Sequence, residues 1–249
     1  MVSGRLASGE RLPPERKLAQ DYGISRPVLR EALRTLRERR LIEVVPGRGT
    51  FVIRPGLAQA AGPLELLYRR QGATTRAVIE ARVMLECEAA RLAAERADVD
   101  DVIELGERLR SLEHSSSVLE RVRRDLAFHL QVVSASHNPV IETMFASIMR
   151  LSVELMLRSA TDRELRQKND PYHVAVYEAI KARDSAAAVE AMNAHLIVSP
   201  KTFGPDYEQS LEAVAVRGMR SLGYRDLEDF LNDVTTDPEP RAGDGVRHK

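Results

Sequence analysis

The stretch from Leu12 to Val52 constrains the fold of this chain of 249 residues more than any other part. Its apolar spacing and turn residues predict a helix over residues 15–22 and a second helix that begins after Ser25. Two β-rich runs, residues 42–45 and 50–53, follow these helices and predict a short hairpin. This order of elements is typical of a winged helix-turn-helix, in which the second helix enters the major groove of DNA.

Residues with special backbone preferences mark the turns between these elements. Pro14 presets the first turn of the first helix. Gly23 favours the end of that helix, because glycine adopts the left-handed conformation without strain. The sequence Pro-Gly-Arg-Gly at residues 46–49 predicts the turn of the hairpin. Turn chemistry and apolar spacing therefore predict the same fold.

The polar face of the second helix carries arginines that suit double-stranded DNA. An arginine fork can bond the O6 and N7 atoms of guanine together. Arg26 and Arg30 lie in the N-terminal half of the helix, which is the part that meets base edges. Arg48, between two glycines, can bring a cation and bare backbone amides to a phosphate or the minor groove. A solvated basic helix is the alternative, but the arginine face, the turn and the wing together favour DNA binding.

Four short motifs resemble the DNA-binding domain of the GntR superfamily of bacterial transcription regulators. They are Gly-Glu-Arg-Leu-Pro at 9–13, Glu-Arg-Lys-Leu-Ala at 15–19, Ser-Arg-Pro-Val-Leu-Arg-Glu-Ala-Leu at 25–33 and Gly-Arg-Gly-Thr-Phe-Val at 47–52. The resemblance implies that Arg16, Arg26 and Arg30 contact DNA, with Gly49 at the wing. Members of the family usually carry a further helix before these motifs, whereas only four residues precede Arg5 here. This departure suggests a start further upstream or a head without one of its core helices.

The charge of the chain is unevenly distributed although its formal net charge is zero. Residues 1–55 hold 12 of the 37 basic and 6 of the 37 acidic residues, a net charge of +6. The remainder therefore holds 25 basic and 31 acidic residues, a net charge of −6. A basic front and an acidic body agree with a DNA-reading head joined to an effector domain.

Cysteine usage and hydropathy favour a cytoplasmic protein. Cys87 is the single cysteine of the chain, so no internal disulfide can form, which fits a reducing compartment. The sequence contains no apolar run long enough to span a membrane, and we recognise no signal peptide at its start. We therefore expect no membrane association.

The rest of the chain is predicted to be helical, so the fold class is mainly α. Residues 56–62 lack strong periodicity and predict a linker between the two domains. Residues 63–203 are expected to form an all-α antiparallel bundle. Helix-start signals divide this region at Thr74 or Thr75, Asp98 or Asp100, Ser115 or Ser116, Asn138-Pro139, Asp170-Pro171, and Asp184 or Ser185.

One carboxylate and three imidazoles in the predicted bundle form a candidate metal site. Asp125 and His129 are four residues apart, so they project from the same face of one helix. His173 and His195 each lie 11 residues from a turn near Asp184, so they are level in an antiparallel hairpin. Such a set suits a divalent transition metal. Each histidine taken alone is more simply an ordinary helix residue, and this alternative stays open for the set.

The predicted bundle also resembles the FCD effector domain of the FadR-like GntR subfamily. The matching strings include Glu-Ala-Arg at 80–82, Asp-Leu-Ala-Phe-His at 125–129 and Asn-Pro at 138–139. The resemblance implies that Asp125, His129, His173 and His195 bind zinc, nickel or a similar ion. It also implies that Arg82 faces the same cavity, where its guanidinium can bind the carboxylate of a small effector. A surface ion pair with the residue one turn further on is the alternative for Arg82.

Residues 204–249 extend beyond the usual end of that domain. We expect a helical extension over about 207–222 and 226–231, followed by a disordered tail from residue 235. The leading hypothesis is a homodimeric transcription regulator that binds operator DNA and responds to a small organic acid at the metal site. The alternative is a metal-dependent hydrolase or lyase that uses the same Asp/His₃ set. No catalytic motif such as His-Glu-x-x-His is present, so we do not expect an enzyme.

Overall fold

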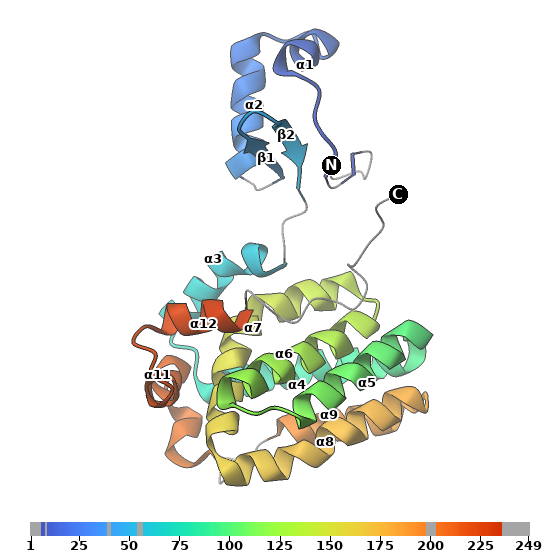
Figure 1. Ribbon diagram of the computed structural model, residues 1–249, viewed down its shortest axis with the longest axis vertical. Helices are drawn as coiled ribbons and strands as arrows, with labels where there is room; N and C mark the ends of the chain where they lie inside the picture. The colour runs from blue at the N-terminus through green and yellow to red at the C-terminus, as the bar shows by residue number, and fades with distance from the viewer. Residues whose placement is uncertain (1–5, 8, 39–40, 54–56, 198–202, 236–249) are drawn as a thin grey trace. The chain divides into compact units, whose positions relative to one another are not determined.

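The computed structural model describes residues 6–7, 9–38, 41–53, 57–197 and 203–235 (Figure 1). The chain divides into two compact units, residues 1–60 and 61–249, and each is described by itself. Most of the tail that was expected to be disordered, residues 236–249, lies outside the described residues. Both units are built mainly from helices, as the sequence predicts.

The N-terminal unit is the predicted winged helix-turn-helix. In chain order, it contains helix α1 (Glu15–Asp21), helix α2 (Arg26–Glu38) and the antiparallel strands β1 (Ile42–Val45) and β2 (Gly49–Val52). Gly23, between the two helices, has a φ of +64°, which is the left-handed conformation expected of it. Strand β2 begins one residue earlier than predicted, because Gly49 already pairs with Val45.

A small apolar core holds this unit together. Leu12, Ile42 and Val52 are buried at its centre. Leu18 of α1 and Leu33 of α2 pack against them, each from the apolar face of its helix. The polar faces of the two helices therefore remain on the surface, where DNA can meet them.

Helix α3 (Leu57–Arg70) replaces most of the predicted linker. The boundary between the two units still falls inside that segment, after residue 60. Gly62 is expected to belong to the linker and Pro63 to begin a short helix, whereas both residues lie inside α3. The Leu-Ala-Gln-Ala-Ala run at residues 57–61 has high helix propensity, which outweighs one missing backbone donor.

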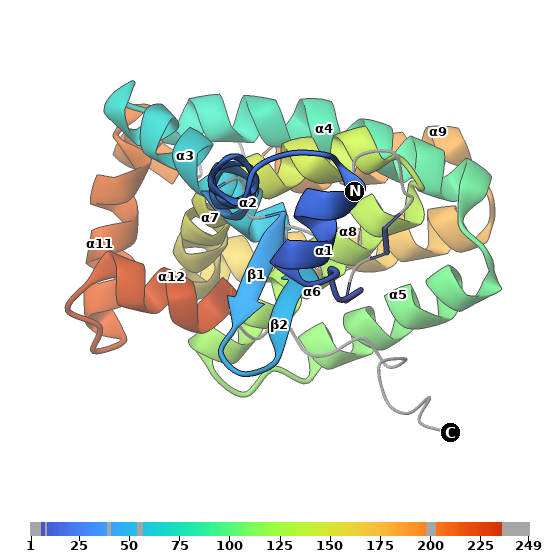
Figure 2. The same ribbon diagram turned by 90° about the horizontal axis from the view of Figure 1, so that it is seen from above.

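The second unit is an all-helical bundle (Figures 1 and 2). Its helices in chain order are α4 (Thr75–Arg96), α5 (Val99–Glu113), α6 (Val118–Ala135), α7 (Pro139–Thr161), α8 (Arg163–Lys181) and α9 (Ser185–Leu196). Helix α4 packs against α6, α7, α8 and α9. The predicted caps Thr74, Asp98, Asn138 and Asp184 all accept backbone hydrogen bonds at helix starts.

Helix α8 begins a full two turns earlier than the sequence predicts. Its N-cap is Asp162, whose carboxylate accepts hydrogen bonds from the amides of Glu164 and Leu165. Pro171 therefore lies inside the helix rather than in its first turn. His173 is consequently a mid-helix residue, although its distance from the turn at Asp184 is unchanged.

Small side chains allow the central helices of the bundle to approach closely. Ala90, Ala93 and Ala94 of α4 are fully buried and face Ala188 and Met192 of α9. The distance between two packed helices depends on the size of the side chains at the contact. Because alanine side chains are small, they allow the two backbones to approach closely. This packing places α4 and α9 close enough for their side chains to share one cavity.

Three short elements follow the bundle: the 3₁₀ helix η1 (Gly204–Glu208), α11 (Leu211–Ser221) and α12 (Leu227–Thr235). The single helix expected over 207–222 is therefore two elements. Phe203, Leu211, Phe230 and Leu231 bury apolar side chains against the bundle. No helix among the described residues is long and apolar enough to cross a membrane.

Candidate metal and effector site

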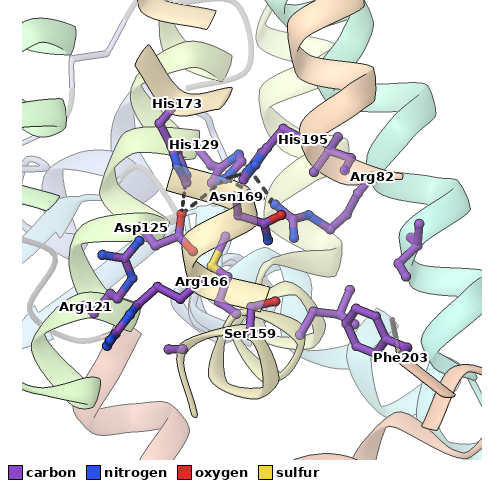
Figure 3. Close-up of a pocket in the computed structure, with 15 residues that line it drawn as sticks. Arg82, Arg121, Asp125, His129, Ser159, Arg166, Asn169, His173, His195 and Phe203 are labelled. Carbon is purple, nitrogen blue, oxygen red and sulfur yellow. Dashed lines mark hydrogen bonds and ion pairs between the residues drawn. The ribbon is translucent and has the colours of Figure 1, made fainter. Parts of the chain in front are cut away.

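The four candidate metal ligands meet in the interior of the helical unit (Figure 3). Asp125 and His129 come from α6, His173 from α8 and His195 from α9. Their ligand atoms all lie within 4.8 Å of one another. The rings of His173 and His195 are 4.2 Å apart, so the two helices do place them at one level. The three histidines are buried, which is unusual for polar residues without a shared partner.

The distances between the ligand atoms fit a single metal ion. The Nε2 atom of His173 lies 2.9 Å from Asp125 Oδ1, and that of His129 lies 3.4 Å from it. The Nε2 atoms of His129 and His195 are 3.1 Å apart. Ligands placed ~2.1 Å from a tetrahedral ion are ~3.4 Å from one another. All three histidines thus direct the same ring nitrogen toward one point, and the residues present fit a bound transition metal.

Glu86 of α4 orients His129 from behind and was missed as part of the site. It is fully buried and accepts hydrogen bonds from His129 Nδ1 and from Arg82 Nε, the latter at 2.6 Å. A carboxylate on the far nitrogen of a ligating histidine fixes the tautomer that leaves Nε2 free for the metal. The sequence analysis treated this residue only as an ion-pair partner for Arg82. The pair is buried rather than on the surface, and Arg82 also lines the cavity.

The electrostatics of the cluster favour an anionic carboxylate and a neutral imidazole. Burial would raise the pKa of Asp125, but hydrogen bonds from His129 and His173 hold it well below its usual range. Burial, together with His173 and His129, lowers the pKa of His195 far below its usual value. Burial also opposes ionisation of Glu86, yet Arg82 and His129 lower its pKa to about 2. These protonation states are the ones that metal ligation and its carboxylate support require.

The pKa of His129 shifts in the opposite direction. Burial lowers it, but the carboxylates of Glu86 and Asp125 more than compensate and raise the pKa above its ordinary value. Without a metal, the protonated ring of His129 bridges two carboxylates. A metal ion bound at Nε2 would displace the proton from that nitrogen.

The cavity beside the cluster has further polar walls. The cavity has a volume of about 40 Å³, so it admits small ligands only. Besides Arg82 and the four ligand candidates, polar side chains from α6, α7 and α8 line it: Arg121, Ser159, Arg166 and Asn169. The sequence signal for them is periodicity, because Arg121, Asp125 and His129 are spaced four residues apart. Arg166 was not recognised because the predicted start of α8 lay after it.

The predicted DNA contacts lie on the surface of the winged helix-turn-helix. Arg26 is the first residue of α2, and Arg30 follows one turn later, 3.6 Å from Glu15. Arg16 is in α1, and its side chain is exposed. Arg48 is exposed in the hairpin turn, with its guanidinium 5.8 Å from the ring centre of Phe51.

Gly49 has a structural requirement that the sequence analysis did not include. Its φ is +118°, a value that other residues rarely adopt. A Cβ at this position would lie 2.7 Å from Arg11 Nε. Arg11 thus lies across the base of the wing, but its flexible side chain could move aside, so the positive φ is the stronger reason for glycine at this position.

The chain combines a winged helix-turn-helix with a helical unit that contains a histidine-lined cavity. This architecture is typical of transcription regulators that carry a DNA-binding domain and a helical domain on one chain. Residues 1–52 match the family described as "Bacterial regulatory proteins, gntR family", and residues 77–197 match the "FCD domain". The chain belongs to the GntR family of transcription regulators, in the FadR-like subfamily that carries an FCD domain.

Curated relatives agree with this assignment. The chain is 32% identical to the Glc operon transcriptional activator of Escherichia coli K12 over 206 residues, which cover 79% of this chain and 81% of the relative. It is 28% identical to the HTH-type transcriptional regulator LutR of Bacillus subtilis, over 84% of this chain and 99% of the relative. The structure described as Streptococcus agalactiae GntR has the same fold, with a TM-score of 0.64 and 24% identity over 79% of this chain and 91% of that one.

Proposed function

We propose that this protein is a ligand-responsive transcription regulator that binds operator DNA as a homodimer. The observation that carries the proposal is the convergence of one carboxylate and three imidazole nitrogens beside a small cavity. A divalent transition metal, zinc or nickel by the nature of the donors, supplies a positive charge there for a small carboxylate effector. Arg82 lines the same cavity and offers a guanidinium to that carboxylate. We expect the protein to act in the cytoplasm, where its DNA is.

The cavity is well placed to act on the arrangement of the bundle. Its walls come from α4, α6, α7, α8 and α9, so a ligand that binds there contacts most of the helices at once. A ligand shifts an equilibrium between two arrangements only by its difference in affinity for them. We propose that the effector binds one helix arrangement more tightly and so changes how well the heads fit the operator.

Dimerisation is supported by an exposed apolar groove on the helical unit. The groove has a volume of about 580 Å³ and is lined mainly by side chains of α3, α4 and α7. Leu64, Met84 and Met144 are large apolar residues there, each more than 40% exposed. Exposed patches of this kind are typical of protein interfaces. We propose that a second copy of the chain covers this groove, which brings two reading helices to a pseudo-palindromic operator.

The test uses the full chain and a double variant, Asp125→Ala with His195→Ala. We expect freshly purified wild-type protein to contain a transition metal by elemental analysis and to lose thermal stability on chelation, because the ion ties α6, α8 and α9 together. The variant should bind DNA from its own upstream region in a retardation assay, yet bind no metal and ignore carboxylates that alter wild-type binding. A wild type with less than ~0.1 equivalent of metal and no uptake on titration would contradict the metal site.

A further inference from the structure

The flank of the cavity next to Asp125 holds cationic and amide groups that metal binding does not use. Arg121 of α6 and Arg166 of α8 both line it, together with Asn169 of α8. Figure 3 shows these two arginines on the Asp125 flank of the cluster, whereas Arg82 lies on the His195 flank. The cavity therefore presents cations on two sides of the candidate metal centre.

The charges of the cavity balance only if a bound ligand carries two negative charges. Arg82 is paired with Glu86, and Arg121 is paired with Asp170, so each of these arginines is neutralised by a carboxylate. Asp125 contributes one negative charge, and Arg166 contributes one positive charge. Among the described residues, no partner forms a hydrogen bond or ion pair with the side chain of Arg166, although the residue is partly buried and its backbone amide bonds Asp162 O. A divalent ion adds two positive charges, which a dianionic ligand would offset.

The helix register gives the distance between the two anion-binding positions. Arg121 is one turn before Asp125 on the same face of α6, about 6 Å along the axis. Arg166 is seven residues before His173 on α8, about 10 Å along the axis. A ligand that reaches from the metal to these guanidinium groups therefore spans only a few carbon atoms, in keeping with the small cavity.

We infer that the effector is a compact dianion whose second anionic group is held by Arg166 and Arg121. One carboxylate meets the metal, and the second anionic group, a second carboxylate, meets the two guanidinium groups on the opposite side of Asp125. Asn169 donates or accepts a hydrogen bond to the polar substituent between them. This inference rests on the proposed function, since it identifies the chemical class of the effector for that same site.

The experiment compares ligands that differ in one group. Malate and 3-hydroxybutyrate have the same skeleton, except that a methyl group replaces the second carboxylate. Calorimetric titration of the full, metal-loaded chain should show malate binding at least tenfold more tightly, the effect expected of one additional charged hydrogen bond. The pair 3-phosphoglycerate and glycerate tests whether a phosphate serves as the second group.

Variants of Arg166 test whether this residue causes the preference for malate over 3-hydroxybutyrate. In Arg166→Gln, malate affinity should fall about tenfold or more, to near that of 3-hydroxybutyrate, whose own affinity should not change. Arg166→Lys keeps the charge and should retain part of the preference, which shows that the loss in Arg166→Gln is not a folding defect. Arg163→Gln removes an exposed arginine of the same helix and should leave both affinities unchanged.

The outcomes separate this inference from the proposed function. If wild-type protein takes up metal but binds 3-hydroxybutyrate as tightly as malate, and glycerate as tightly as 3-phosphoglycerate, the dianion inference is wrong and the regulator proposal stands. The same conclusion follows if Arg166→Gln weakens both members of each pair equally. If the wild type takes up no metal and none of the four probes binds, the proposed function fails, and this inference fails with it.

Discussion

Glu86 shows how a single buried side chain can organise a site without entering it. Its carboxylate holds Arg82 on one side and His129 on the other, inside the bundle. Burying a charge is unfavourable unless it is paired, so the residue stabilises the site only while both partners remain in place. Its position on α4, one turn after Arg82, also links that helix to the candidate metal ligands on α6.

The first prediction concerns the hydrogen bond by which Glu86 orients His129. Glu86→Gln keeps the shape of the side chain but weakens the acceptor for His129 Nδ1–H, so the imidazole is less firmly oriented. We expect a loss of 10- to 100-fold in metal affinity, the usual range for such supporting carboxylates. Competition titration against a coloured chelator measures it. Glu88→Gln, two residues along and exposed, is the matched control, and equal behaviour of the two variants would count against the role of Glu86.

The second prediction concerns DNA binding by the N-terminal winged helix-turn-helix. Arg26→Ala or Arg30→Ala should each cost about 1–3 kcal/mol of specific DNA binding if that arginine contacts a base. Arg48→Ala should weaken binding to all sequences more evenly and reduce the dependence of affinity on salt, as expected for a phosphate contact. Fluorescence anisotropy with operator and scrambled duplexes measures both effects. Wild-type affinity in both helix variants would mean that α2 is not the reading helix.

The sequence predicted the metal-ligand candidates because their spacing is regular, but not the groups that surround them. Asp125 and His129 are one turn apart, and His173 and His195 are equidistant from a turn. Both relations can be read along one helix or one hairpin. Glu86 meets His129 across two helices that are not consecutive, so its role depends on tertiary packing. Such contacts have no local periodicity to reveal them.

At the scale of elements, the errors of prediction came from proline. Pro63 lies inside α3 and Pro171 inside α8, whereas the sequence analysis began a helix at each. Asp162 supplies a cap that competes with the Asp-Pro signal eight residues later, and the flanking residues have adequate helix propensity. The remaining boundaries in the bundle agree with their predicted caps, except that Ser117 rather than Ser115 or Ser116 caps α6.

Helix α3 is joined to the bundle by a buried network of charges. Arg69 of α3 pairs with Glu154 of α7, whose carboxylate is fully buried, and with Glu65 of its own helix. Arg150 of α7 forms an ion pair with Glu65, with Nε and Oε2 2.9 Å apart. Burial and the neighbouring carboxylates outweigh Arg69 and raise the pKa of Glu154 to about 7. Because Leu155, the next residue in α7, lines the cavity beside the histidine cluster, α3 and that cavity lie on different sides of α7.

The third prediction follows from that pKa. A carboxyl group whose pKa is raised on folding binds its proton more tightly in the folded state. Its contribution to stability is therefore full below pH 4.5 and is lost as the pH rises through about 7. The difference is on the order of 3 kcal/mol for the wild type. Glu154→Gln should abolish this slope in denaturant unfolding curves measured across that range, whereas Glu190→Gln, at an exposed position of α9, should retain it.

At the scale of the whole molecule, two units with separate cores carry separate tasks. The head has its own apolar cluster around Leu12, Ile42 and Val52, and the helical unit has several clusters of its own. The division was predictable from the sequence, since the winged pattern ends near residue 53 and the charge changes sign beyond it. The exposed groove between α3, α4 and α7 was not predictable, because surface grooves are formed by residues from distant segments.

The fourth prediction tests what covers the groove. Met144→Glu places a charge among its apolar walls, and a second copy could bind there only by burying that charge. We expect the mass measured by light scattering to fall toward that of one chain and operator binding to weaken with it. Val99→Glu alters an exposed apolar residue of α5 that lies outside the groove and should change neither. An unchanged mass for Met144→Glu would place the dimer interface elsewhere.

Phe203 gives the helical extension a consequence for how such a regulator diversifies. It lines the effector cavity, yet it lies beyond residue 197, where the match to the FCD domain ends. If the chain responds to an effector as we propose, its specificity depends partly on a segment that carries neither the candidate metal ligands nor helix α2. Substitutions in this segment could change which effector is bound, while the candidate metal ligands and the DNA-reading helix stay the same. For biosensor engineering, a library randomised at Phe203 would change the shape of the cavity and leave the DNA-binding residues unaltered.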